Sequence, residues 1–179
     1  MRARSIVGDR PEGRPASDFY PTPPEAVYKL LEVETLKGLI WEPACGDGAI
    51  SKVLIEAGHS VVSTDLFDHG YGKADIDFLT SDACIPIVTN PPFKLANEFI
   101  QHAHNINVPY FAFLMKLTAL EGVKRSAILE RTRLTRVWVF RKRLTMTRNG
   151  EPSRNGGMIA FAWFVWERGN TEPPAIGWI

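Results

Sequence analysis

Short apolar runs alternate with amphipathic segments along most of this chain, and that alternation constrains the fold more than any other feature. Apolar runs lie at 38–41, 59–65, 84–89 and 108–116, and apolar residues at helical spacing lie at 49–58, 94–106 and 118–132. The run at 108–116 is nearly all apolar, as expected of a strand buried on both faces. Strands that alternate with helices are joined by crossovers and form a mainly parallel sheet. The pattern predicts an α/β protein with a Rossmann-like, mainly parallel seven-stranded sheet flanked by helices.

The two ends of the pattern differ from its centre. A further helix is expected over 21–34, where Thr22 can cap and Pro23 and Pro24 suit the first turn. Residues 76–80 are a short third strand or its end. Runs 136–140 and 158–169 are joined by a polar loop instead of a helix, which predicts an antiparallel pair at one edge of the sheet. The tail, 170–179, is expected to be irregular.

Length and composition indicate one folded unit. A chain of 179 residues is most often one domain, and an apolar fraction of 45% is ample for a core. Residues 1–17 are rich in Arg, Gly and Pro and predict a flexible arm, so 18–179 is expected to be a single domain. No apolar run approaches the ~20 residues of a membrane span, and the N-terminus lacks the apolar stretch of a signal peptide.

The two cysteines, Cys45 and Cys84, lie far apart and have no metal-ligand spacing, and the four histidines show no metal pattern either. We interpret both cysteines as packing residues. A reduced, cytoplasmic protein without a metal fits this usage.

Charge is distributed unevenly. The net charge is +1, but residues 131–154 hold eight basic residues and one acidic residue, so this stretch carries +7 and the rest of the chain −6. Such a stretch suits a phosphate backbone, although a solvated hairpin is the plainer interpretation. The candidate nucleic-acid contacts are Lys94, Arg141, Lys142, Arg143, Arg148 and Arg154.

Three polar loops follow predicted strands, at the edge where open α/β sheets bind ligands. Gly46 and Gly48 lie between the first strand and its helix, which is either a plain turn or a close approach to a cofactor. A third glycine and a following Gly-Lys-Ser/Thr are both missing, so neither the dinucleotide fingerprint nor a P-loop is present. Asp65 ends the second strand, where an acid can accept hydrogen bonds from ribose hydroxyls or cap a helix. The acidity of Glu42 and Asp47 disfavours a pyrophosphate and suits a cofactor with a cationic group.

The third loop is "NPPF", 90–93, and with it the chain resembles a known family. "EPACGDG" at 42–48, Asp65 and "NPPF" together resemble the class I S-adenosylmethionine-dependent methyltransferases, above all the DNA adenine-N6 group. "DFYPTPPEAV" at 18–27 resembles the segment of those DNA enzymes that closes over the cofactor. "AFAWFVWERG" at 160–169 is similar to the last strand of their small phage and prophage members.

The resemblance implies a role for each matching residue. The S-adenosylmethionine site would comprise Tyr20, Thr22, Pro23, Glu42, Pro43, Ala44, Cys45, Gly46, Asp65, Asp77 and Phe78. Asp77 and Phe78 would meet the cofactor's adenine, although Asp75 is equally well placed by alternation. The catalytic corner would comprise Asn90, Pro91, Pro92 and Phe93. Members with this motif order usually carry a separate target-recognition domain, but only 86 residues follow Phe93, so recognition is expected from loops or a partner.

The chemistry of the corner suits an exocyclic amino group, whose lone pair is delocalised into its ring. The Asn90 side-chain oxygen and the Pro91 carbonyl can accept its two N–H donors and aim its lone pair at the methyl group, and Phe93 can stack on the base. Methyl transfer to N6 of adenine in DNA is therefore the main hypothesis. RNA bases and protein glutamine are alternative substrates, and a non-catalytic nucleic-acid-binding module of the same fold is the alternative from another class.

Overall fold

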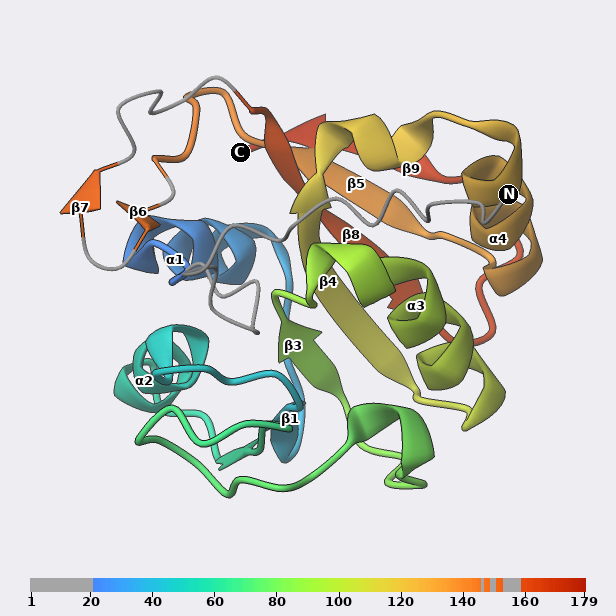
Figure 1. Cartoon of the computed structure of the whole chain (residues 1–179). Coiled ribbons are helices and arrows are strands. Elements are labelled where there is room, and N and C mark those ends of the chain that lie inside the picture. The colour runs from blue at the N-terminus through green and yellow to red at the C-terminus, as the bar shows by residue number, and fades with distance from the viewer. Residues whose placement is uncertain (1–20, 146, 149–150, 153–158) are drawn as a thin grey trace, which may run out of the picture.

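The computed structural model describes residues 21–145, 147–148, 151–152 and 159–179, which form one seven-stranded sheet with helices on both faces (Figure 1). The strand order is β2-β1-β3-β4-β8-β5-β9, and the predicted Rossmann-like α/β fold is confirmed. The strands are β1 (Ile40–Glu42), β2 (Val61–Ser63), β3 (Ile87–Thr89), β4 (Tyr110–Lys116), β5 (Arg136–Val139), β8 (Phe161–Glu167) and β9 (Ala175–Trp178). A separate small ribbon pairs β6 (Thr147–Arg148) with β7 (Glu151–Pro152). The expected arm, 1–17, together with Tyr20 and Arg154, lies outside the described residues.

Strands β2, β1, β3 and β4 are parallel, whereas β8 runs antiparallel to both of its neighbours, β4 and β5. The predicted antiparallel pairing of β5 with β8 is confirmed, but its expected place at the edge is wrong. Strand β8 lies inside the sheet, because six of its seven residues are apolar and buried and so need cover on both faces.

The edge beyond β5 is formed by the tail. Residues 175–178, expected to be irregular, form β9 and pair in parallel with β5. Gly177 permits this pairing, since a Cβ atom there would collide with the Trp138 ring. At the far side of the sheet, residues 76–80 contribute no strand. Phe78–Thr80 form the short helix η1, and the Asp77 side chain caps it by accepting from the Leu79 N–H at 2.9 Å.

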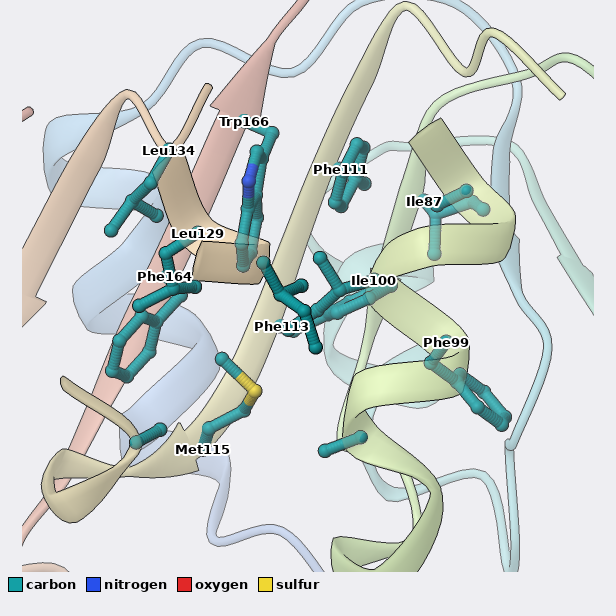
Figure 2. Close-up of a cluster of buried hydrophobic side chains, with 14 of the residues drawn as sticks. Ile87, Phe99, Ile100, Phe111, Phe113, Met115, Leu129, Leu134, Phe164 and Trp166 are labelled. Carbon is teal, nitrogen blue, oxygen red and sulfur yellow. The ribbon is translucent and has the colours of Figure 1, made fainter. Parts of the chain in front are cut away.

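The helices are α1 (Pro24–Val33), α2 (Ala49–Glu56), α3 (Ala96–Asn105) and α4 (Val123–Thr132), with the short helices η2 (Phe93–Leu95) and η3 (Leu117–Leu120). Helices α1 and α2 cover one face of the sheet, and α3 and α4 cover the other (Figure 1). Figure 2 shows the core beneath α3 and α4, where Trp166 stacks on Phe111 with ring centroids 4.7 Å apart. This two-sided burial leaves the ends of the strands as the place for a site.

Helix α1 is tied to the sheet through its backbone and its last turn. The Trp163 indole donates to the Ala26 carbonyl at 2.7 Å. The buried Glu34 carboxylate, just after α1, accepts from Arg136 Nε at 2.6 Å and from Trp138 Nε1 at 2.7 Å. Thr22 does not cap the helix as expected, because Pro23 occupies the N-cap position. The contact with Trp163 holds the start of α1 against the sheet. Because Thr22 does not cap the helix, its hydroxyl is available to another partner.

Candidate active site

Four loops meet at one edge of the sheet, the one formed by the carboxyl ends of its parallel strands. The segments 43–48, 64–77 and 90–95 follow the carboxyl ends of the parallel strands β1, β2 and β3. Lys116 at the end of β4 pairs with Phe161, and Val139 at the end of β5 pairs with Ala162. The register therefore brings the ends of the basic loop between β5 and β8 to the same edge as the three predicted site loops.

The loop after β1 depends on its two glycines. Gly46 and Gly48 have φ values of +52° and +80°, in the left-handed region that side chains disfavour. Gly48 is also covered by the Tyr71 ring, which a Cβ atom at position 48 would strike. The close turn that the sequence indicated is present, and Tyr71 is a part of it that the pattern did not reveal.

Asp65 holds this loop from below. Its side chain is buried, Oδ2 accepts from the Gly46 N–H at 2.9 Å, and Oδ1 accepts from the Phe67 N–H at 3.0 Å. The sequence predicts that Asp65 accepts hydrogen bonds from the ribose hydroxyls of a cofactor. Each carboxylate oxygen can accept a second hydrogen bond, so the observed contacts and a ribose contact are compatible. The carboxylate is in any case needed to shape the loop.

Glu42 is buried beneath the loop, with 1% of its surface exposed. Its carboxyl accepts from the Ser51 N–H at 2.8 Å and bonds the Ser51 hydroxyl, so it caps α2 from inside. Burial raises the pKa of Glu42 from 4.5 to about 8, against the lowering effect of these hydrogen bonds. A carboxyl with that pKa is largely protonated at pH 7, so the half-buried Asp47 is the acid of this loop with access to solvent.

The cysteines differ from each other. Cys45 is 2% exposed, and burial raises the pKa of its thiol to about 12, with Glu42 and Asp65 adding to the effect. Cys45 is thus a packing residue, as predicted. Cys84 is exposed and its thiol donates to the Asn107 carbonyl, so its interpretation as a packing residue is wrong.

Phe78 and Asp77 both have structural roles. Phe78 is 2% exposed and its ring packs against Phe99 with centroids 4.6 Å apart, and also against Trp41. The Asp77 carboxylate caps η1. Asp75, the other acid in this loop, is exposed and has φ of +58°. The ring of Phe78 thus belongs to the core, and the Asp77 carboxylate is engaged at the start of η1.

The corner at 90–93 contains a contact that the sequence did not predict. Asn90 Nδ2 donates to Thr22 Oγ1 at 3.1 Å, and Thr22 is 4% exposed. The amide nitrogen of Asn90 therefore faces the hydroxyl that precedes α1. Pro91 is buried, and Pro92 precedes the turn of η2. Thr22, Asn90 and Pro91 are together in the structure although 68 residues separate Thr22 from Asn90.

Phe93 is half-buried at the edge of the core. Its ring lies 5.9 Å from the Phe161 ring, and Lys116 Nζ lies 4.5 Å from its centroid. The ammonium group at the end of β4 therefore covers part of the ring that the sequence assigned to base stacking. Lys94, a predicted phosphate contact, is exposed on η2 beside it.

A cavity of about 430 Å³ lies next to Phe93, which the sequence did not indicate. It is lined by η2 and the start of α3, the end of β4, and the segment from η3 to the start of α4. Its charged lining residues are Lys116, Glu121, Lys124 and Arg125.

Only some of the predicted nucleic-acid contacts lie among the described residues. Arg141, Lys142 and Arg143 are exposed directly after β5, at the site edge, and Arg148 lies in β6.

Within the described ranges, no helix is long and apolar enough to cross a membrane. Those same ranges contain no group of three His, Cys, Asp or Glu side chains that could hold a metal ion.

Comparison with known proteins identifies the fold. A protein from Vibrio vulnificus assigned as the modification subunit of a type I restriction enzyme superposes with a TM-score of 0.60 at 15% identity, over 89% of this chain and 46% of its own. A protein from Pyrococcus horikoshii assigned as an RNA methyltransferase gives 0.58 at 13%, over 80% and 81%. Magnesium protoporphyrin IX methyltransferase from Synechocystis, solved with bound S-adenosylmethionine, gives 0.51 at 16%, over 79% and 75%.

The chain therefore has the class I methyltransferase fold, and it spans a little under half the length of the Vibrio subunit. No model of a protein family matches the sequence, and no curated protein matches it.

Proposed function

We propose that this protein is an S-adenosylmethionine-dependent methyltransferase that modifies the N6 amino group of adenine in DNA. The observation that carries the proposal is the hydrogen bond from Asn90 Nδ2 to Thr22 Oγ1 at the end of β3. An asparagine amide whose N–H is committed to a threonine presents its oxygen as an acceptor. An acceptor followed by a rigid proline carbonyl is what a weakly nucleophilic amino group requires.

The reaction needs little acid–base chemistry from the chain. Asn90 Oδ1 and the Pro91 carbonyl accept the two N–H groups of the target, which aligns the nitrogen lone pair. The bound cofactor would supply the methyl group, and the two acceptors would keep the target nitrogen aligned with it until the nitrogen loses its proton. Neither acceptor ionises, so the geometry is independent of pH near neutrality.

The loop after β1 fits the proposed cofactor. Gly46 and Gly48 give close backbone approach, and Asp47 supplies a negative charge suited to a sulfonium. Asp65 and the segment around Asp77 would hold the nucleoside part. When bound, the cofactor supplies an activated methyl group, and the protein supplies position.

A nucleic-acid substrate is supported by charge at the same edge. Arg141, Lys142 and Arg143 are exposed where the basic loop leaves β5, and Lys94 is exposed next to Phe93. A base inside a duplex cannot reach Asn90, so the target is flipped out or single-stranded. A base-stacking role for Phe93 requires the Lys116 side chain to move from the ring.

The test is transfer of a labelled methyl group to oligonucleotides that contain a single adenine. Single- and double-stranded DNA and the matching RNA are compared, and the product nucleoside is identified by mass spectrometry. N6-methyladenine in DNA is expected, and the Asn90→Ala variant should turn over about 10²–10³-fold more slowly with unchanged cofactor affinity.

Asn105→Ala is the matched control, because Asn105 is an exposed asparagine at the end of α3. Product found only in RNA would replace the DNA assignment. Full activity in the Asn90→Ala variant would reject the proposed mechanism.

A further inference from the structure

The cavity next to Phe93 lies outside the methyl-transfer corner. Phe93 lines it, whereas Asn90, Pro91 and Thr22 do not. A group that fills this cavity is therefore close to the reacting base but is not the reacting base. Its volume of about 430 Å³ is in the range of small-molecule sites.

The walls combine an apolar floor with polar and cationic groups. Met115 and Ala119 are buried apolar residues beneath the cavity, and Asn97 contributes a side-chain amide. Asn97 Oδ1 is a buried atom without a hydrogen-bond partner among the described residues. An apolar floor with an amide at its side is suited to a flat heterocycle that carries N–H groups and acceptors.

The rim is positively charged. Lys116, Lys124 and Arg125 line the cavity against a single acid, Glu121. Lys124 and Arg125 lie in the first turn of α4, where the helix dipole and the free N–H groups also favour an anion. Cations around an apolar floor fit a base joined to phosphates better than they fit a peptide or a neutral metabolite.

Given the proposed function, on which this inference rests, we propose that the cavity holds a nucleotide adjacent to the target adenine. Its base lies over Met115 and Ala119 with Asn97 at its edge, and its phosphate lies against Lys124 and Arg125. Lys116 leaves the Phe93 ring and joins this phosphate, which frees the ring for the target. The enzyme thereby reads at least one base that flanks the target.

The experiment measures binding of single-stranded DNA by fluorescence anisotropy, with the demethylated cofactor present. Each nucleotide that flanks a single adenine is replaced in turn by an abasic one. In the unmodified protein, one flanking position should lose roughly 10-fold in affinity, as expected when one stacked base is removed. Asn97→Leu and Ala119→Leu should bind the intact strand more weakly and lose that positional difference.

A salt series tests the phosphate contacts. The slope of log affinity against log salt should fall by about 0.7 for each of Lys124→Gln and Arg125→Gln. Lys37→Gln is the control, since Lys37 is exposed before β1 at the opposite edge of the sheet. Its slope should match that of the unmodified protein.

Equal losses at every flanking position, or an unchanged positional difference in the Asn97→Leu and Ala119→Leu variants, would overturn the inference even if adenine is methylated. A persistent positional difference without methyl transfer to adenine would reject the proposed function and leave the nucleotide site standing. Absence of any DNA binding would reject both.

Discussion

Replacing Glu42 with glutamine should make the protein more stable at neutral and alkaline pH. Glu42 is 1% exposed and caps α2 through the Ser51 N–H, and burial raises its pKa to about 8. A glutamine with Oε1 in place of the contacting carboxyl oxygen accepts from both the Ser51 N–H and the Ser51 hydroxyl. The substitution therefore keeps the cap and removes the cost of an ionised buried group.

The size of the effect follows from the two pKa values. The folded state holds the Glu42 proton more tightly than the unfolded state, whose pKa is near 4.5. The stabilising contribution of the protonated form is thus fully present below pH 4.5 and is lost as pH rises toward 8. Linkage at about 1.4 kcal/mol per pH unit gives a loss of about 3 to 4 kcal/mol between pH 5 and pH 8. The Glu42→Gln variant lacks this loss.

The assay is urea unfolding of both proteins at several pH values, followed by circular dichroism. The difference in unfolding free energy between the variant and the parent should grow steadily from pH 5 to pH 8. Glu130→Gln is the control for loss of one surface charge, because Glu130 is exposed on α4. A pH-independent difference, or a variant that is destabilised at pH 8, would refute the assignment of Glu42 as a buried acid that stays protonated.

Three further outcomes are expected. Thr22→Val should lower the rate of adenine methylation at least 10-fold with little effect on DNA affinity, and Thr22→Ser should retain the rate of the unmodified protein. Equal rates in the Thr22→Val variant and the unmodified protein would show that the bond to Asn90 Nδ2 has no positioning role. Iodoacetamide at pH 8 should label Cys84 in the native protein but Cys45 only after unfolding, as read by peptide mass spectrometry, and native labelling of Cys45 would contradict its burial. Glu34→Gln should lower the unfolding free energy by about 1 to 2 kcal/mol, since the arginine of β5 loses its buried partner but keeps Glu167. Glu32→Gln on the exposed side of α1 should change it little, and equal effects would contradict this role of Glu34.

The central features of the fold could be predicted from periodicity because they are dictated by burial. Strand β4 is apolar on both faces, so its place inside the sheet follows from its residues alone. Strand β8 is also apolar on both faces, and its predicted place in an edge pair is wrong. Its apolar pattern calls for two neighbours, whereas chain order suggested only one.

The missed elements depend on contacts distant in sequence. Strand β9 has only four residues, and its pairing rests on Gly177 fitting against Trp138. The sequence of residues 76–80 is compatible with a strand or a helical turn, because Phe78 would be buried in either. The Asp77 side chain caps η1 and so favours the turn. Local propensity does not carry such information.

The candidate site shows the same division. The glycines after β1 and the corner at Asn90 are local chemical signals, and the structure brings both to one edge. The bond between Thr22 and Asn90 and the internal cap by Glu42 need the tertiary fold. A sequence pattern can indicate which side chains carry reactivity, but their protonation and orientation depend on packing.

The position of β8 has a consequence for the order in which the protein is made. Strands β4 and β5 never touch as neighbours, because β8 lies between them and is synthesised after both. Until residue 167 leaves the ribosome, the facing edges of β4 and β5 have no partner, and the Trp163 indole cannot yet reach the carbonyl of Ala26. Closing the sheet therefore joins segments far apart in the chain, which slows folding. Nascent chains stopped before 161 should expose two apolar strand edges and be strong clients for chaperones.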